Sequence, residues 1–174
     1  MTTTTAERIC LNLGCGNKFF RAEDVKWINV DFPGNSFNCK PDIEADIRQL
    51  PFPDDYADEI HAIHVIEHIH TWEVEDLLKE WKRVLKPGGW MAIECPDLNK
   101  ILRLLINRER NPAKTLLGLY GAQDSKDPNM VHKWCYTWLM LRDLLEGIGF
   151  QNVSEKPCQW HIPKRDIRVE CRKP

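Results

Sequence analysis

The chain has 174 residues, of which 43% are hydrophobic and 29% charged, a composition typical of globular domains and unlike that of disordered chains. The 24 lysines and arginines nearly balance the 26 aspartates and glutamates, so the formal net charge is -2. This balance excludes strong long-range attraction to nucleic acid or to an anionic membrane. We therefore expect one domain spanning residues 1–174, a small-molecule or glycan-type partner, and a monomer or homodimer.

The cellular location is predicted from the N-terminus and the cysteines. Residues 1–7 are rich in threonine and lack the apolar core of a signal peptide, so we expect them to be disordered. No apolar run reaches the length of a membrane helix. The seven cysteines form no C-x-x-C pair, which favours reduced thiols, mostly in the core, and a cytoplasmic protein.

The first third of the chain reads as short strands separated by turns, with too few residues between them for long helices. Residues 17–26 leave room for one or two helical turns at most, and residues 33–41 are rich in Gly, Asn, Ser and Pro. The expected strands are residues 8–13, 26–31, 42–46 and 59–65.

The first long helix is expected at residues 71–85, with Thr71 as its N-cap and acidic residues in its first turn. The motif K-P-G-G at 86–89 ends it. Its apolar stripe is expected to consist of Trp72, Leu77, Leu78, Trp81, Val84 and Leu85.

Strands and helices also alternate in the second half of the chain. We expect a strand at 90–95, then a helix at 98–106 that Asn111-Pro112 breaks. A polar and aromatic insert at 107–136 follows, long enough to be a lid. A helix capped by Thr137 precedes two final strands, 151–156 and 167–171. In the last strand apolar and charged residues alternate, which is typical of an edge strand with one solvent-exposed face.

Strand-then-helix alternation predicts an α/β fold. Specifically, we expect a Rossmann-like, doubly wound, mostly parallel sheet with an antiparallel C-terminal edge hairpin. In such sheets ligands bind outside the carboxyl ends of the strands. Gly14 and Gly16 follow the first strand, Asp31 ends the second, and Asp46-Ile47 ends the third.

These residues suit a nucleoside. A glycine turn allows close approach of the backbone, and a carboxylate at Asp31 can accept two hydrogen bonds from a ribose diol. Asp46 could accept from an adenine amino group while Ile47 covers the ring. Each feature also has a structural interpretation, as a turn glycine or a solvated or capping aspartate. Asp58, which follows a turn, is interpreted as structural.

Five ordered motifs carry a family resemblance. L-N-L-G-C-G (11–16), W-I-N-V-D (27–31), the segment 45–60, H-V-I-E-H-I (64–69) and R-V-L-K-P-G-G-W (83–90) resemble class I S-adenosylmethionine-dependent methyltransferases. The likeness is strongest to a small branch with a shortened glycine-motif region. The third glycine of a dinucleotide-binding motif is absent, which disfavours NAD.

The resemblance implies roles at each position. The turn Leu13-Gly14-Cys15-Gly16 would hold the methionine part of S-adenosyl-L-methionine and Asp31 its ribose hydroxyls. Asp46 and Ile47 would meet the adenine, and His64 would border the transferable methyl group.

Deprotonation of the acceptor needs a base near the methyl group. The candidates are His64, Glu67, His68, Asp97 and His132, of which we favour His64 and His132 as catalytic. Tyr120, Gln123, His132, Trp134 and Tyr136 of the insert could form an acceptor pocket together with Glu67, His68 and Asp97. The alternative is a surface excursion whose aromatics cover the core.

Two further clusters, one of histidines and one of basic residues, have more than one interpretation. His61, His64, His68 and His70 match no zinc spacing, so we expect no metal, and a histidine-metal hydrolase remains only an alternative. The basic residues between Lys100 and Lys114 are interpreted as a solvated helix face, or alternatively as a site for a phosphate-bearing acceptor. The sequence thus predicts a methyltransferase acting on an O or N atom, with a non-catalytic cofactor-binding module as the main alternative.

Overall fold

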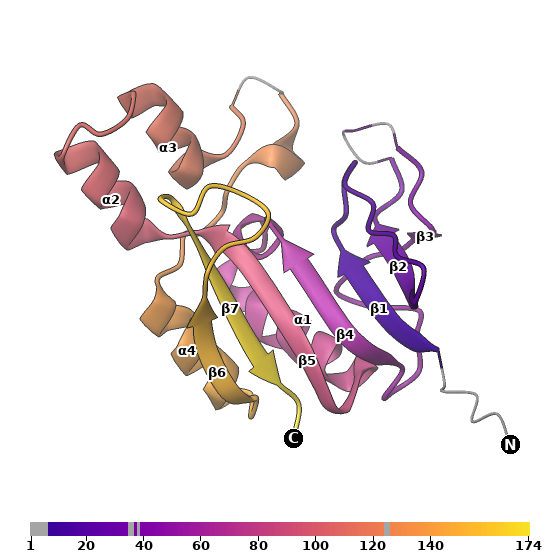
Figure 1. The fold of residues 1–174 in the computed structure, drawn as a ribbon. Helices are drawn as coiled ribbons and strands as arrows, with labels where there is room; N and C mark the ends of the chain where they lie inside the picture. The colour runs from indigo at the N-terminus through magenta and orange to yellow at the C-terminus, as the bar shows by residue number, and fades with distance from the viewer. Residues whose placement is uncertain (1–6, 35–36, 38, 124–125) are drawn as a thin grey trace, which may run out of the picture.

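The computed structural model describes residues 7–34, 37, 39–123 and 126–174, so most of the threonine-rich segment expected to be disordered lies outside it. Seven strands form one sheet in the order β3-β2-β1-β4-β5-β7-β6 (Figure 1). The first five in this order run parallel, and β7 pairs antiparallel with both β5 and β6. The strands are β1 (Arg8–Leu13), β2 (Val25–Asp31), β3 (Ile43–Glu44), β4 (Ala57–Ile63), β5 (Leu85–Pro96), β6 (Gln151–Lys156) and β7 (Asp166–Arg172). The predicted fold class is confirmed.

The helices lie behind the sheet and beyond one of its ends. In Figure 1, α1 and α4 lie behind the sheet, whereas α2 and α3 extend past the carboxyl end of β5. Their bounds are α1 (Thr71–Val84), α2 (Leu98–Ile106), α3 (Pro112–Tyr120) and α4 (Trp138–Gly147), with short 3-10 turns η1 (Ile66–His68) and η2 (Pro128–Met130).

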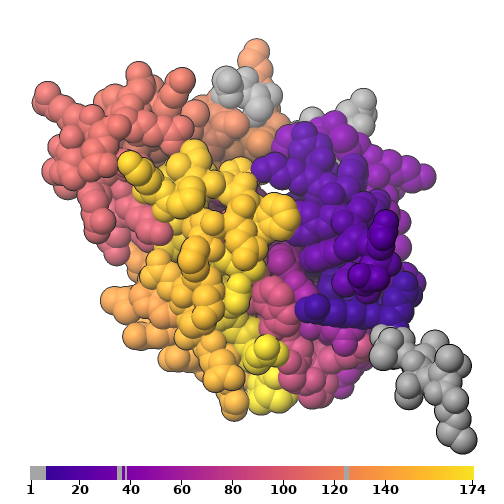
Figure 2. All heavy atoms as spheres, in the orientation of Figure 1, coloured from indigo at the N-terminus to yellow at the C-terminus, as the bar shows by residue number. Residues whose placement is uncertain are grey.

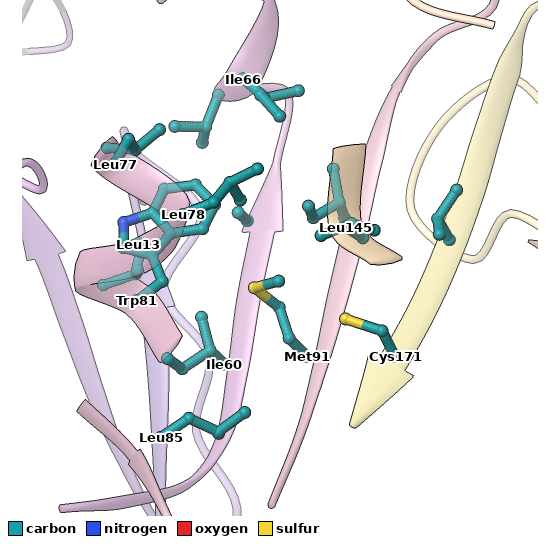
Figure 3. Close-up of a cluster of buried hydrophobic side chains, with 14 of the residues drawn as sticks. Leu13, Ile60, Ile66, Leu77, Leu78, Trp81, Leu85, Met91, Leu145 and Cys171 are labelled. Atoms are coloured by element: carbon teal, nitrogen blue, oxygen red, sulfur yellow. The ribbon is translucent and has the colours of Figure 1, made fainter. Parts of the chain in front are cut away.

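The core lies between the sheet and the two helices behind it. Figure 3 shows Leu78 and Trp81 of α1 beside Leu13 and Ile60 of the parallel strands, and Leu145 of α4 beside β5 and β7. All five side chains are fully buried. The indole N–H of Trp81 donates to the carbonyl of Ile47 at 3.0 Å, so this large side chain is buried without an unsatisfied donor.

The other face of the sheet is covered by loops rather than helices. The described parts of the β1–β2 and β2–β3 connections contain no helix, as their short lengths predict. Phe20 stacks on Trp160, with 4.4 Å between the ring centroids. Figure 2 accordingly shows the yellow segment that precedes β7 meeting the indigo segment that follows β1.

The start of α1 differs from the prediction. His70, not Thr71, occupies the N-cap position, and its side chain makes no capping hydrogen bond. Its ring instead stacks on Trp72, with 4.1 Å between centroids. Trp72 was expected in the apolar stripe, but 74% of it is exposed, because it precedes Trp81 by two and a half helical turns and so lies on the opposite side of α1. Val74 of the same turn is buried and takes its place in the stripe.

The last strand is an inner strand, so the expectation that it forms the edge is wrong. β7 lies between β5 and β6, and β6 is the edge. The alternation of charged and apolar residues was misleading because Arg168, only 1% exposed, pairs with the fully buried Glu94 at 3.0 Å. The charged side chain at this position of β7 is therefore neutralised in a buried ion pair and does not face solvent.

The insert at 107–136 contains a helix that the sequence analysis did not predict. The side chain of Asn111 caps α3 by accepting from the N–H of Lys114, and Pro112 follows at the first helical position. Asn111-Pro112 thus begins the second helix, although we interpreted it only as the end of the first. None of the helices among the described residues is long and apolar enough to span a bilayer.

Candidate functional site

A cavity of about 730 Å³ opens at the carboxyl ends of β1, β2 and β4, where ligands bind in sheets of this topology. Three groups of residues from the N-terminal half line it: the glycine turn, the ends of β2 and β3, and the segment after β4. The opposite wall comes from the insert and from the segment between β6 and β7. The lining residues on that wall are Ala122, Asn129, Met130, His132, Lys133, His161 and Arg165.

The glycine turn lines the cavity with bare backbone. Gly14 and Gly16 have φ of 62° and 51°, a conformation that favours glycine. A Cβ atom on Gly14 would lie 2.6 Å from Cγ2 of Val65, and one on Gly16 would lie 2.9 Å from the ring of Phe37. Both backbone conformation and space therefore require glycine here. Cys15 also lines the cavity, whereas Leu13 is fully buried in the core and does not.

Asp31 faces the same cavity from the end of β2 and is only 5% exposed. Its Oδ2 accepts the backbone N–H of Gly16 at 2.6 Å, and its Oδ1 accepts that of Phe32 at 2.8 Å. Burial raises the pKa of the carboxyl, and these two N–H donors partly offset the effect. Each carboxylate oxygen keeps a second lone pair for a ligand hydroxyl.

Asp46 and Ile47 lie two and three residues beyond β3 and line the cavity beside Asp31. The guanidinium of Arg48 donates to both oxygens of Asp46, at 2.8 to 3.1 Å, and this holds the pKa of the carboxyl below its usual value. Arg48 also pairs with Glu73 of α1 at 2.9 Å. The half-buried Ile47 supplies an apolar surface next to these charges.

His64 follows β4 directly and has a φ of 56°, an uncommon conformation for a residue with a Cβ. The predicted strand 59–65 therefore ends at Ile63. Nδ1 of His64 lies 2.8 Å from Oε1 of Glu67, and Nε2 lies 3.2 Å from Oδ2 of Asp166. Burial alone would lower the pKa of His64, but the two carboxylates raise it to about 9.

Lys18, His161 and Arg165 are among the cavity residues that were not predicted from sequence. The ring of His161 lies tilted against that of His64, with 4.0 Å between centroids, and its Nε2 lies 2.7 Å from Nζ of Lys18. Arg165 donates to Asp166 at 2.8 Å. All three reach the cavity through loops, and no local pattern distinguishes them. The one available signal was the run W-H-I-P-K-R-D between the last two strands, which carries several charged groups.

A second polar cluster joins the segment after β4 to the insert. Glu67, His68 and His132 each offer one ligand atom, and these atoms lie within 4.8 Å of one another. The rings of His68 and His132 are 4.8 Å apart and nearly perpendicular. Both histidines line the cavity, and Glu67 lies behind them, 1% exposed.

The remaining predicted site residues lie away from the cavity wall. Asp97 caps α2 by accepting from the N–H groups of Asn99 and Lys100, which explains an acid after β5 without a ligand. Tyr120 and Trp134 are 58% and 44% exposed, and Gln123, also exposed, donates to the carbonyl of Tyr120. Tyr136 is buried. The insert therefore contributes to the site mainly through His132 and its neighbours.

The histidines outside the cavity have structural neighbours. His61 contacts Glu59 and packs edge-on against Trp27 and Trp90 on the loop-covered face. Asp58 accepts from the N–H of Ile9 and from Lys86, consistent with its structural interpretation.

Comparison with known proteins identifies the domain. Residues 11–93 match a family model described as a methyltransferase domain. This match, to slightly less than half of the chain, agrees with the predicted class I S-adenosylmethionine-dependent methyltransferase. Part of the chain is also similar to the sterol 24-C-methyltransferase of Pneumocystis carinii, with 41% identity over 59 residues. That match spans 33% of this chain and only 15% of the sterol enzyme.

Solved methyltransferase structures share the fold over nearly the whole chain. A SAM-dependent methyltransferase from Archaeoglobus fulgidus has a TM-score of 0.64 and 19% identity, covering 97% of this chain and 87% of that one. One from Methanosarcina mazei has a TM-score of 0.63 and 18% identity, covering 97% and 93%. Human N-acetylserotonin methyltransferase, solved in complex with SAM, has a TM-score of 0.62 and 17% identity, covering 95% and 47%.

Proposed function

We propose that this methyltransferase domain binds S-adenosylmethionine in the cavity and transfers its methyl group to an oxygen or nitrogen atom of a small-molecule or glycan-type acceptor. One observation carries the proposal: a glycine turn without Cβ atoms faces the buried carboxylate of Asp31 at the carboxyl ends of β1 and β2. The cofactor supplies an activated methyl group, so the protein has mainly to bind and align the reactants.

The residues present fit the cofactor. The turn at Gly14 and Gly16 leaves room for the methionine part against bare backbone. The free lone pairs of Asp31 would accept the two ribose hydroxyls, and the charge of the carboxylate strengthens such bonds. Asp46 would accept from the adenine amino group, and Ile47 would cover one face of the ring.

The acceptor would lie between the glycine turn and the wall formed by the insert. His64 borders this space, but both its ring nitrogens face carboxylates, so it has no free lone pair with which to act as a base. His132 differs, because its Nδ1 donates to the carbonyl of Gly118 at 3.0 Å and leaves Nε2 free. Of the two histidines expected to be catalytic, we therefore assign proton removal to His132. His64 would instead place its positive charge at the border of the acceptor space.

The acceptor class rests on charge and cavity size. The net charge of -2 offers no extended attraction to a nucleic-acid backbone. A cavity of about 730 Å³ is within the usual range for small-molecule sites. The similarity to the sterol enzyme covers too little of that protein to suggest its acceptor.

Cofactor binding is tested by calorimetry with S-adenosylhomocysteine, which cannot react. We expect binding by the unmodified protein and a loss of about 100-fold in affinity for Asp31→Ala, as the removal of charge-assisted hydrogen bonds implies. Asp76→Ala is the matched control, because that aspartate is exposed on α1. Asp46→Ala provides a second variant if Asp31→Ala disturbs the glycine turn. An unmodified protein that does not bind would refute the proposal.

Transfer is tested separately by measuring release of S-adenosylhomocysteine with a panel of hydroxylated and amino-bearing small molecules and glycans. Turnover with any member supports the enzyme. Tight binding without turnover across the panel would support the alternative of a non-catalytic cofactor-binding module.

A further inference from the structure

The Glu67–His68–His132 cluster has the chemistry of a cation site. Two imidazoles and one carboxylate offer ligand atoms within 4.8 Å of one another, although His132 is 64 residues away from His68 in the chain. This donor set is the one that binds divalent transition metals such as iron(II) and zinc while leaving coordination positions open. Both histidines also line the cavity, so open positions would face it.

The tautomers of the two histidines are set by backbone carbonyls. Nδ1 of His68 lies 3.2 Å from the carbonyl oxygen of Val131, and Nδ1 of His132 lies 3.0 Å from that of Gly118. A carbonyl oxygen only accepts, so each Nδ1 carries the proton and each Nε2 presents a lone pair. Metal-binding histidines are held in this way, with the second ring nitrogen donating to a carbonyl or carboxylate.

Glu67 provides an independent indication of a ligand. Its side chain is 1% exposed, and its Oε2 has no hydrogen-bond or ion-pair partner among the residues that the structure describes. Oε1, by contrast, forms an ion pair with Nδ1 of His64 at 2.8 Å, so the carboxylate is only partly compensated. A buried carboxylate oxygen without a partner is costly, and a cation bound between Oε2 and the two histidines would remove that cost.

In a neighbouring cluster, the potential ligand atoms are already paired with side chains of the protein. His64, His161 and Asp166 also offer three ligand atoms. There, however, Arg165 donates to Asp166 at 2.8 Å, and Nζ of Lys18 lies 2.7 Å from Nε2 of His161. Glu67 pairs through Oε1 with His64 and, among the described residues, with no lysine or arginine. The two clusters are therefore not equivalent, and a metal is favoured only at the first.

We propose that Glu67, His68 and His132 bind one divalent transition-metal ion at the cavity wall. This revises the expectation of no metal. The inference deepens the proposed function and, for its role in catalysis, rests on it: the acceptor would be an oxygen nucleophile that binds the ion through its hydroxyl group. The ion would lower the pKa of that hydroxyl and so ease loss of its proton. Nε2 of His132 would then be occupied by the ion, so this inference replaces His132 as the base: the hydroxyl proton would pass to solvent water as the oxygen attacks the methyl carbon and S-adenosylhomocysteine leaves.

The test uses the full chain without a polyhistidine tag, stripped of metal with a chelator and titrated with Co²⁺ and Zn²⁺. We expect roughly one equivalent of each ion to bind, with the visible absorption of Co²⁺ reporting nitrogen and oxygen ligands. Glu67→Gln and His132→Ala should each weaken binding by about 100-fold or more, since each removes a ligand.

His70→Ala is the matched control, because His70 stacks on Trp72 outside the cluster, and it should bind Co²⁺ like the unmodified protein. His161→Ala should also retain binding if the first cluster is the site. Circular dichroism checks that each variant is folded. Glu67→Gln introduces an amide of nearly the same shape, so it keeps the test valid if His132→Ala does not fold.

The outcomes separate this inference from the proposed function. No binding of Co²⁺ or Zn²⁺, or equal binding by Glu67→Gln and His132→Ala, would overturn the metal site. Loss of binding in His161→Ala alone would overturn the assignment to this cluster. Binding of S-adenosylhomocysteine is measured on the same samples, so failure of the proposed function appears independently of the metal result.

Discussion

The backbone N–H of Gly16 donates to Oδ2 of Asp31 at 2.6 Å, which ties the turn after β1 to the end of β2. A second bond, from the N–H of Cys15 to the carbonyl of Val30 at 3.1 Å, reinforces this link. The carboxylate proposed to bind a ribose thus also shapes the turn proposed to hold the methionine part. No helix connects β1 to β2. The side chain of Asp31 therefore helps to hold the glycine turn in position.

Substitution of Gly14 should damage both stability and cofactor binding. Gly14→Ala adds a Cβ 2.6 Å from Cγ2 of the buried Val65 and leaves φ at 62°. We expect a loss of about 2–3 kcal/mol in the free energy of unfolding, from strain plus overpacking. Gly88→Ala is the control, because Gly88 also has a positive φ but open space around it, and should cost only about 1 kcal/mol. Urea denaturation measures both, and equal losses would contradict the steric argument.

The two tryptophans of α1 should respond very differently to truncation. Trp81→Ala empties a fully buried position and should cost about 3–5 kcal/mol of unfolding free energy. Trp72→Ala removes a side chain that is 74% exposed and should change stability by about 0.5 kcal/mol or less. Thermal or chemical denaturation distinguishes the two. A large loss for Trp72→Ala would instead indicate that this side chain is covered in solution.

Glu94 links the sheet to the segment that carries His161 and Arg165. Its Oε1 accepts from Arg168 at 3.0 Å and from the N–H of Gln159 at 2.8 Å, inside the protein. Glu94→Gln leaves the buried guanidinium with only the partly exposed Glu170 as its anion, so we expect a loss of about 3 kcal/mol. Weaker binding of S-adenosylhomocysteine should accompany it. Glu155→Gln, in the edge strand and largely exposed, is the control and should change neither quantity.

The loss of folding stability at acidic pH should depend on Asp166. Burial opposes ionisation of this carboxyl, but His64 and Arg165 hold its pKa well below the usual value. A lowered folded-state pKa stabilises the protein fully above the unfolded-state pKa of about 3.9, and this contribution is lost as the pH falls below that value.

Melting temperatures of Asp166→Asn and of the unmodified protein, measured from pH 6 to about pH 3, test this dependence. The variant should be less stable at pH 6, and its melting temperature should fall less steeply in the acid range. Parallel curves with a constant offset would show that the side chain acts by packing rather than by charge.

Most elements of the fold were predictable because local patterns encode them. The helix of residues 98–106 and the helix capped by Thr137 were predicted correctly, since a period of apolar residues and a cap lie next to each other in the chain. The wrong predictions concern positions where one sequence pattern fits two different structures. Asn111-Pro112 both ends and begins a helix, and Arg168 alternates like a surface residue although Glu94 neutralises it in the interior.

The sequence by itself determined the sheet, the glycine turn and the acids that follow the strands, because strand ends, turns and caps depend on neighbouring residues. Only the tertiary structure decided which histidines meet. It separated His61 from the cavity, set His64 between two carboxylates, and brought His132 to Glu67 and His68. These contacts join loops far apart in the chain, and their geometry depends on how the whole sheet places the loops.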